Sequence, residues 1–304
     1  FIGGSIRGGA GLGSGSVEVN DAKGKLAFFV RGDVAGGDGD DSGVMDFQNG
    51  VSKVTIEGSV IGGAGSTSGR IEIDQSNSFR GSFLLKGDVR GGTGAGSGDI
   101  ELNYTVSKGT VLGSVIGGSG NGSGIFEVDE ESGPIVVGGS IIGGGPNAGN
   151  VEIVDAPSFV LGGDLRSGTA LNAGQLETGR VGVLTIGGSI FGGSVAFGNI
   201  SADGVGTLTI GGSVTGTNIV PVRIESRAPE TGPGAHVAFG KVTIGGSATF
   251  ARIHGGFQSF DGLSDSDAQI GAVLIKGDFI GSDIVVAATP GGGGDFGDGN
   301  DTIV

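Results

Sequence analysis

The sequence predicts an all-β fold, a single parallel β-solenoid (a β-helix) of about 11 coils, each of 24–34 residues. Three observations lead to this class: Gly at 73 of 304 positions, a short motif that recurs eleven times, and apolar residues on both sides of every copy. A chain so rich in glycine and without periodicity would be typical of a disordered segment. Because the motif returns at a nearly constant spacing, a repeat fold is indicated instead.

The recurring motif is an apolar residue, any residue, an anchor glycine, Ser or Asp, and a second apolar residue. The anchors are Gly4, Gly32, Gly58, Gly87, Gly113, Gly139, Gly163, Gly188, Gly212, Gly246 and Gly277. The apolar positions lie two residues before and two residues after each anchor, which is the alternation of a strand with one buried face. Stacked coil on coil, they predict continuous apolar rows, and the general crossover rule favours a right-handed winding.

The domain organisation predicted from this repeat is a solenoid over residues 1–290, followed by a tail rich in Gly and Asp over residues 291–304. Within each coil, a glycine pair ends the first strand and a Gly/Ser/Asn segment turns the chain. A second strand follows, and a further turn returns to the next anchor. The spacing loosens to 34 and 31 residues between Gly212 and Gly277, which marks the irregular coils.

Composition and charge exclude several classes of function. The chain has no Cys, which excludes disulfides, thiolate metal sites and Cys nucleophiles. Its formal net charge of -15 argues against nucleic acid or an anionic membrane as partner and favours cations or basic partners. No run of 18 apolar residues could span a bilayer. An acidic, Cys-free chain rich in Gly and Ser favours an extracellular location.

The repeat predicts two rows of polar residues along the solenoid, and we expect the two rows to have different roles. The residue after each anchor is always Ser or Asp, and no two neighbouring coils both carry Asp. Stacked carboxylates about 4.8 Å apart would repel by roughly 1 kcal/mol even in water, so this row is interpreted as structural. The second row, about fourteen residues after the anchor, is acidic in seven consecutive coils: Glu18, Asp46, Glu72, Glu101, Glu127, Glu152 and Glu177.

The acidic row predicts ligands for a hard cation such as Ca²⁺, which binds six to eight oxygen atoms. A companion row of oxygen-bearing side chains lies two residues further on, at Asn20, Gln48, Asp74, Asn103 and Asp129, and no Lys or Arg row is expected beside them. The predicted calcium ligands are Glu72, Asp74, Glu101, Glu127, Asp129 and Glu152. The alternative is an exposed acidic stripe, screened by salt, that keeps a long rod soluble.

The repeats VLTIGGSIFGG, TLTIGGSVTG and KVTIGGSATF resemble those of the Gly-rich β-strand-repeat (GGSxxGG-type) surface proteins of bacteria. This resemblance covers nearly the whole chain and implies a β-solenoid that serves as an extracellular passenger, adhesin or stalk. Residues 297–304 resemble an RTX-type calcium repeat, with Phe296 where the first glycine of the motif belongs. That resemblance implies Asp301 as a Ca²⁺ ligand, with Asp298 and Asn300 as additional ligands, and a flexible tail is the alternative.

The irregular coils over residues 215–261 hold a second candidate site. This region contains both histidines, and the candidate ligand groove consists of Arg223, Glu225, His236, Arg252 and His254. Long excursions from a regular scaffold often carry binding sites. The mixture of acids and bases would suit a sugar groove, as in β-helical polysaccharide lyases and hydrolases. Glu225 also falls where the acidic row would continue, 13 residues after Gly212.

The function expected from the sequence is a non-enzymatic extracellular rod, structural or adhesive, acting as a surface stalk, passenger or filament subunit. No nucleophile motif accompanies either histidine, so no enzyme activity is predicted. The expected partners are further repeats of a longer chain or other copies stacked end to end, together with a cell-surface polysaccharide or protein. The alternative is a β-helix that binds or degrades carbohydrate through the irregular coils.

Overall fold

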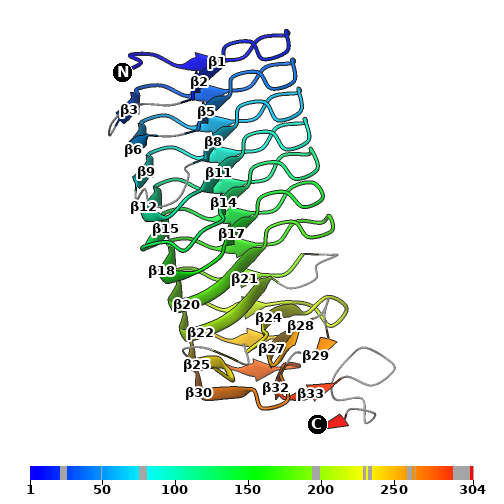
Figure 1. Cartoon of the computed structure of the whole chain (residues 1–304). Coiled ribbons are helices and arrows are strands. Elements are labelled where there is room, and N and C mark those ends of the chain that lie inside the picture. The colour runs from blue at the N-terminus through cyan, green and yellow to red at the C-terminus, as the bar shows by residue number, and fades with distance from the viewer. Residues whose placement is uncertain are drawn as a thin grey trace.

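The computed structural model describes the backbone over residues 1–20, 26–48, 50–74, 81–193, 199–228, 231, 235–258, 262–263, 265–289 and 302–303, and describes no side chain at 258, 262, 263, 289, 302 or 303. Every regular element in this part of the chain is a strand. The strands stack in parallel, coil upon coil, from the N-terminal to the C-terminal end (Figure 1). The predicted all-β parallel solenoid is confirmed.

Each coil contributes one two-residue strand to the first face, which begins directly after the Ser or Asp that follows the anchor. These strands pair in parallel in chain order and form an eleven-stranded sheet. They are β1 (Ile6–Arg7), β4 (Val34–Ala35), β7 (Val60–Ile61), β10 (Val89–Arg90), β13 (Val115–Ile116), β16 (Ile141–Ile142), β19 (Leu165–Arg166), β21 (Ile190–Phe191), β23 (Val214–Thr215), β26 (Ala248–Thr249) and β31 (Phe279–Ile280).

The second face carries the acidic row. Its strands are β2 (Val17–Val19), β5 (Met45–Phe47), β8 (Ile71–Asp74), β11 (Ile100–Asn103), β14 (Phe126–Val128), β17 (Val151–Ile153), β24 (Val222–Ser226), β27 (Ala251–Gly255) and β32 (Asp283–Val286). Between β17 and β24, the long strands β20 (Leu176–Ile186) and β22 (Ile200–Ile210) run through this face and on into the third.

The third face leads back to the next anchor. Its other strands are β3 (Leu26–Val30), β6 (Val51–Ile56), β9 (Gly81–Leu85), β12 (Val106–Val111), β15 (Ile135–Val137), β18 (Ala156–Leu161), β25 (Val237–Ile244) and β30 (Gln269–Ile275). Two antiparallel pairs interrupt the pattern near the C-terminal end, namely β28 (Phe257–Gln258) with β29 (Gly262–Leu263) and β33 (Ala288–Thr289) with β34 (Thr302–Ile303).

The number of regular turns is slightly smaller than the eleven coils expected. Nine turns complete all three faces without an inserted strand, ending with β23, β24 and β25. The tenth turn carries the inserted β28–β29 pair, and the eleventh has only β31 and β32 on its first two faces. The predicted number assigned one coil to each anchor glycine, and the last two anchors, Gly246 and Gly277, begin turns that are irregular.

The Ser/Asp row is structural, as expected. In each coil the backbone N–H of this residue donates to the side-chain oxygen of its counterpart one coil earlier, over 2.8–3.1 Å. The ten bonds join Ser5, Asp33, Ser59, Asp88, Ser114, Ser140, Asp164, Ser189, Ser213, Ser247 and Asp278. Only a short side chain with an acceptor oxygen can reach this N–H, which explains why Ser and Asp alternate in this row.

Serine also holds the glycine-rich loops that follow the first face. The Oγ atoms of Ser42, Ser68, Ser97 and Ser123 are fully buried and accept the N–H of the glycine five residues earlier, over 3.0–3.2 Å. Gly98, next to Ser97, has φ +76°, a conformation that glycine adopts without strain. The Gly/Ser segments are therefore ordered turns, and they lie in register along one side of the rod (Figure 1).

The hydrophobic core consists of the predicted apolar rows. From Val30 to Ile244 the residues two before the anchor are buried, and from Ile6 to Ala248 so are those two after it. The row ends at Phe279, which is 47% exposed on β31. Among the described residues, no helix is long and apolar enough to cross a membrane.

Candidate functional site

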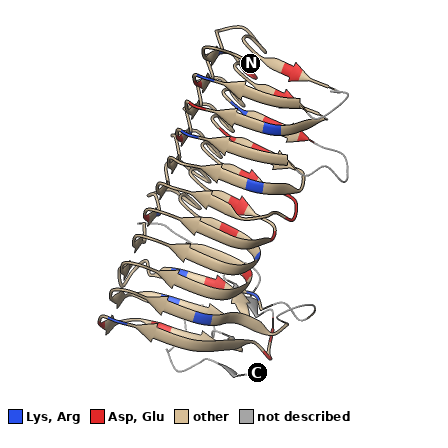
Figure 2. Cartoon of the chain, turned by 90° about the vertical axis from the view of Figure 1, so that its left-hand side faces the viewer, with Lys and Arg blue, Asp and Glu red and all other residues tan. Residues whose placement is uncertain are grey.

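The acidic row runs in strict register along the second face. Each of its seven acids pairs with the next, so that Glu18, Asp46, Glu72, Glu101, Glu127, Glu152 and Glu177 form one column. The column continues through Ser201, Glu225 and His254. Glu225 therefore occupies a position of the acidic row, as the spacing from Gly212 suggested. Acidic positions recur from coil to coil along the rod, whereas Lys and Arg positions are fewer and scattered (Figure 2).

Two cavities lie along this column. The larger, about 440 Å³, is lined by Glu127, Val128, Asp129, Glu152, Ile153, Val154, Asp155, Glu177, Thr178, Gly179, Arg180, Ser201, Asp203 and Arg227. The smaller, about 330 Å³, is nearer the N-terminus and is lined by Gly13, Ser16, Val17, Glu18, Asp41, Val44, Asp46, Thr67, Arg70 and Glu72. We call these two cavities the acidic groove. Six of the seven acids line one of these cavities, whereas Glu101 lines neither, and the two end members, Glu18 and Glu177, are exposed. The sequence did not predict that the middle of the column would be partly buried.

Recessed carboxylates are costly to ionise, and the pKa values along the groove reflect this. Burial, together with a hydrogen bond to Asp129 and the charges nearby, raises the pKa of Glu127 to about 8. Burial, with the charge of Glu177, raises the pKa of Glu152 to about 7. Burial also raises the pKa values of Asp46 and Glu72. The groove therefore favours the uptake of positive charge near neutral pH.

Arginine partly neutralises the groove at one point, although no row of Lys or Arg accompanies the seven acids, as expected. Arg70 lies between two neighbouring coils, where Nη2 is 3.1 Å from Glu72 Oε2 and also donates to Glu101 Oε2. This guanidinium sits one position before β8, the place that Asp99 takes in the next coil. From β2 to β22 this is the only coil with an arginine at that position, and arginine returns there only at Arg223 and Arg252. Arg70 therefore compensates Glu72 and Glu101 and leaves Glu127 and Glu152 to other partners.

From Gln48 to Asp129 the companion row alternates amide and acid. Asp74 pairs with Asn103, whose Nδ2 donates to Asp74 Oδ1 over 2.7 Å. Asp129 follows on the next coil, and its N–H donates to Leu102 O over 3.2 Å. In the larger cavity Asp129 lies beside Glu127 and Glu152. The six acids predicted from the repeat are thus distributed along one column and its neighbour, with Glu127, Asp129 and Glu152 brought into a single cavity.

The larger cavity also has a basic side that sequence reasoning did not assign to the site. Arg180 donates to the carbonyl oxygen of Thr231, and Arg227 lies 3.7 Å from Asp203 Oδ1. Arg180 and Arg227 are the only Arg or Lys side chains among the described residues that line this cavity. Asp155 and Asp203 also line it and also escaped the sequence analysis. Their positions on the turns after β17 and within β22 broke the spacing by which the acidic row was found.

The alternative groove residues are divided between two places. Arg223 pairs with Arg252, and Glu225 pairs with His254, all on β24 and β27. Glu225 and His254 are buried to 3% and 2% exposure, so they do not line an open groove. His236 lies elsewhere, immediately before β25, where its Nδ1 is 2.9 Å from Asp265 Oδ2. The five residues predicted as one groove therefore form two separate clusters.

His254 is held between two carboxylates. Its Nε2 is 3.0 Å from Asp283 Oδ1, and its Nδ1 is 3.8 Å from Glu225 Oε1. Burial alone would lower the pKa of His254, but the bonds to Asp283 and Glu225 outweigh it and raise the pKa. The imidazole and the two acids form a compact cluster, in which the raised pKa of His254 favours its charged form. It closes the acidic column at its C-terminal end.

The three remaining predicted ligands, Asp298, Asn300 and Asp301, lie outside the described residues. The RTX-type calcium site that they suggest stays a prediction.

Comparison with known proteins yields no relative. No family model, no curated protein and no solved structure matches the chain.

Proposed function

We propose that this protein is a non-enzymatic extracellular rod, structural or adhesive, whose acidic groove binds divalent cations, Ca²⁺ foremost. The observation that carries the proposal is the column of seven carboxylates in register, whose five middle members are partly buried. A column that only kept the rod soluble would gain from full exposure to water and salt. Here six of the acids line cavities, and the raised pKa values of Glu127 and Glu152 indicate that a bound positive charge would favour the ionisation of these two acids.

The larger cavity has the chemistry of a calcium site. Glu127, Asp129 and Glu152 supply carboxylate oxygens from two adjacent coils, which are about 4.8 Å apart. Ca²⁺ accepts six to eight oxygens in flexible geometry and often completes its shell with water. A partly built site of this kind binds weakly, in the millimolar to submillimolar range typical of extracellular calcium modules. Calcium sites of this low affinity are therefore consistent with the proposed extracellular location of the rod.

Calcium titration tests the proposal. At pH 8 we expect CaCl₂ to raise the melting temperature, followed by circular dichroism, and EDTA to reverse the shift, because bound cations stabilise only the folded chain. The double variant Glu127→Gln/Glu152→Gln should lose most of the shift. Its matched control, Glu130→Gln/Glu131→Gln, changes two exposed acids of the same coil and should keep it. An identical melting temperature with calcium and with EDTA would contradict the cation proposal.

The rod is proposed to continue beyond its last coil, either into adjoining repeats or into another copy stacked end to end. Within the described residues, β31 pairs only with β26, and Phe279 and Ile280 on it are 47% and 50% exposed. An exposed apolar edge strand is a template for further pairing. Head-to-tail stacking of this kind does not close and would give filaments. Electron microscopy decides the second alternative, since dispersed rods at every concentration would count against stacking.

A second candidate function is carbohydrate binding in the larger cavity. The observation in its favour is that carboxylates and the guanidinium groups of Arg180 and Arg227 line the same space of about 440 Å³. Arg227 belongs to the irregular coils where the sequence placed the alternative site. A panel of neutral and acidic polysaccharides, assayed for binding and cleavage with and without Ca²⁺, tests it. Binding that Arg227→Ala abolishes would support this candidate over the purely structural one.

A further inference from the structure

Few residues of this chain are suitable ligands for a transition metal. Metals such as Zn²⁺ prefer imidazole or thiolate ligands, and the chain has two His and no Cys. His254 is 2% exposed and already held by Glu225 and Asp283. His236, whose side chain is 36% exposed, is the one histidine that an incoming ion could reach.

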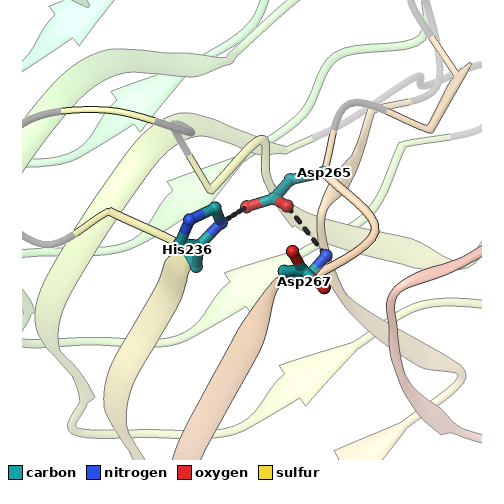
Figure 3. Close-up of side chains that lie close together, drawn as sticks. All are labelled: His236, Asp265 and Asp267. Atoms are coloured by element: carbon teal, nitrogen blue, oxygen red, sulfur yellow. Dashed lines mark hydrogen bonds and ion pairs between the residues drawn. The ribbon is translucent and has the colours of Figure 1, made fainter.

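His236 faces two carboxylates across the inserted turn (Figure 3). It lies before β25, whereas Asp265 and Asp267 lie on the turn that leads into β30. The ligand atoms of His236, Asp265 and Asp267 are all within 4.8 Å of one another. His236 Nδ1 is 2.9 Å from Asp265 Oδ2, and Asp265 Oδ1 accepts the N–H of Asp267 over 2.8 Å. The three groups converge from two segments 29 residues apart.

The backbone fixes this convergence. The N–H of Gln269 donates to His236 O over 2.6 Å, and the N–H of Asp265 donates to Gly256 O over 3.2 Å. His236 itself has φ +61°, an unusual conformation for a residue with a side chain. Asp265 is buried, with 3% of its side chain exposed, and its ion-pair partner His236 carries a positive charge only when protonated. A bound cation would supply a positive charge beside this buried carboxylate without protonation of the imidazole.

We propose that His236, Asp265 and Asp267 form a binding site for a borderline divalent metal of the Zn²⁺ class. One nitrogen and two carboxylate oxygens are a common donor set for such ions. With metal–ligand bonds of about 2.0–2.2 Å, tetrahedral ligands lie roughly 3.3–3.6 Å apart, within the spread of these three groups. The exposed side of Asp267 leaves the fourth position to water. Ca²⁺ is not the expected ion, because it binds oxygen and gains nothing from the imidazole.

Metal titration of the untagged full chain tests the site. Calcium is kept in excess to occupy the acidic groove, and Zn²⁺ is titrated by calorimetry, with Co²⁺ absorption in the visible range as a second readout. We expect one Zn²⁺ site per chain and a Co²⁺ spectrum typical of low coordination number. Failure to detect a Zn²⁺ site under these conditions would overturn the proposal, whatever the outcome of the calcium experiment.

Two variants separate ligation from folding. Asp267→Asn removes an exposed ligand, and His236→Asn removes the imidazole while keeping a residue that tolerates positive φ. Each should weaken Zn²⁺ binding by at least about ten-fold and abolish the Co²⁺ spectrum. The control, Asp278→Asn, makes the same change at an exposed aspartate of the following turn and should bind as the unmodified chain does. Unchanged Zn²⁺ affinity in folded His236→Asn would refute the assignment.

Discussion

At the scale of single residues, the anchor glycines are required by the stacking of the coils. A methyl group on Gly212 would lie far inside van der Waals contact with Ser189 Oγ. That oxygen cannot turn away without cost, because it accepts the N–H of Ser213 over 3.0 Å. The repeat thus selects glycine here for close approach of two coils. A left-handed backbone is not the reason, since Gly212 has no positive φ.

A matched pair of substitutions tests this account. Gly212→Ala should destabilise the fold by about 1–3 kcal/mol, the usual cost of forcing an extra methyl group into a packed site. Gly4→Ala makes the same change in the same row, but nothing lies within 4 Å of the added methyl group, so its effect should be small. Urea unfolding followed by circular dichroism gives both values. Similar losses in the two variants would show that backbone conformation, and not stacking, selects the glycine.

At the scale of the strand, the acidic column makes stability depend on pH. The folded state holds the proton of Glu127 up to a pKa of about 8, whereas an unfolded chain releases it near the ordinary value of about 4.3. Between these two values the folded chain binds more protons, so stability must fall as the pH rises. Glu152, with a pKa raised to about 7, acts in the same direction.

This linkage predicts the effect of removing one charge from the column. In the absence of divalent cations, Glu127→Gln should stabilise the chain at pH 8. At that pH the unmodified fold must either ionise Glu127 beside other carboxylates or keep it protonated, and both cost free energy. At pH 4 it should change little, because Glu127 is then protonated in the fold. Glu130→Gln, at an exposed acid three residues on, is the control. Thermal unfolding across pH 4–9 measures the difference, and a uniform effect at all pH values would contradict the linkage.

The strands and the site were predictable from sequence to different degrees. The alternation of apolar residues about each anchor predicted the core rows. The nearly constant distance of about fourteen residues from the anchor predicted the acidic column from Glu18 to Glu177, because every coil repeats the same register. Arg70 escaped, since the coils on either side of it carry other residue types at its position, and an isolated arginine leaves no periodic signal. The contact between His236 and Asp265 escaped for another reason: it spans the inserted turn, where no repeat fixes which residues face each other.

At the scale of the whole molecule, the rod is a one-dimensional stack. Each coil contacts its neighbours on both sides, and stability is then close to a sum over coils and interfaces. The core residues of β11, β14 and β17 are buried beneath coils on both sides, whereas residues of the last two turns, including Leu274, Phe279 and Ile284, are 42–50% exposed. Coils at the ends have fewer partners, and so they open at a lower cost than those in the middle.

Hydrogen exchange measured by mass spectrometry should therefore follow a gradient along the rod. We expect amides of β31 and β32 to exchange first and those of β11, β14 and β17 last, because local opening spreads inwards from the coils with one neighbour. Adding Ca²⁺ should slow exchange most around β14, β17 and β20, which form the larger cavity. If β31 gained protection as the protein concentration rose, another copy would be covering it. Uniform exchange from β4 to β31 would instead show that the solenoid unfolds as one cooperative unit.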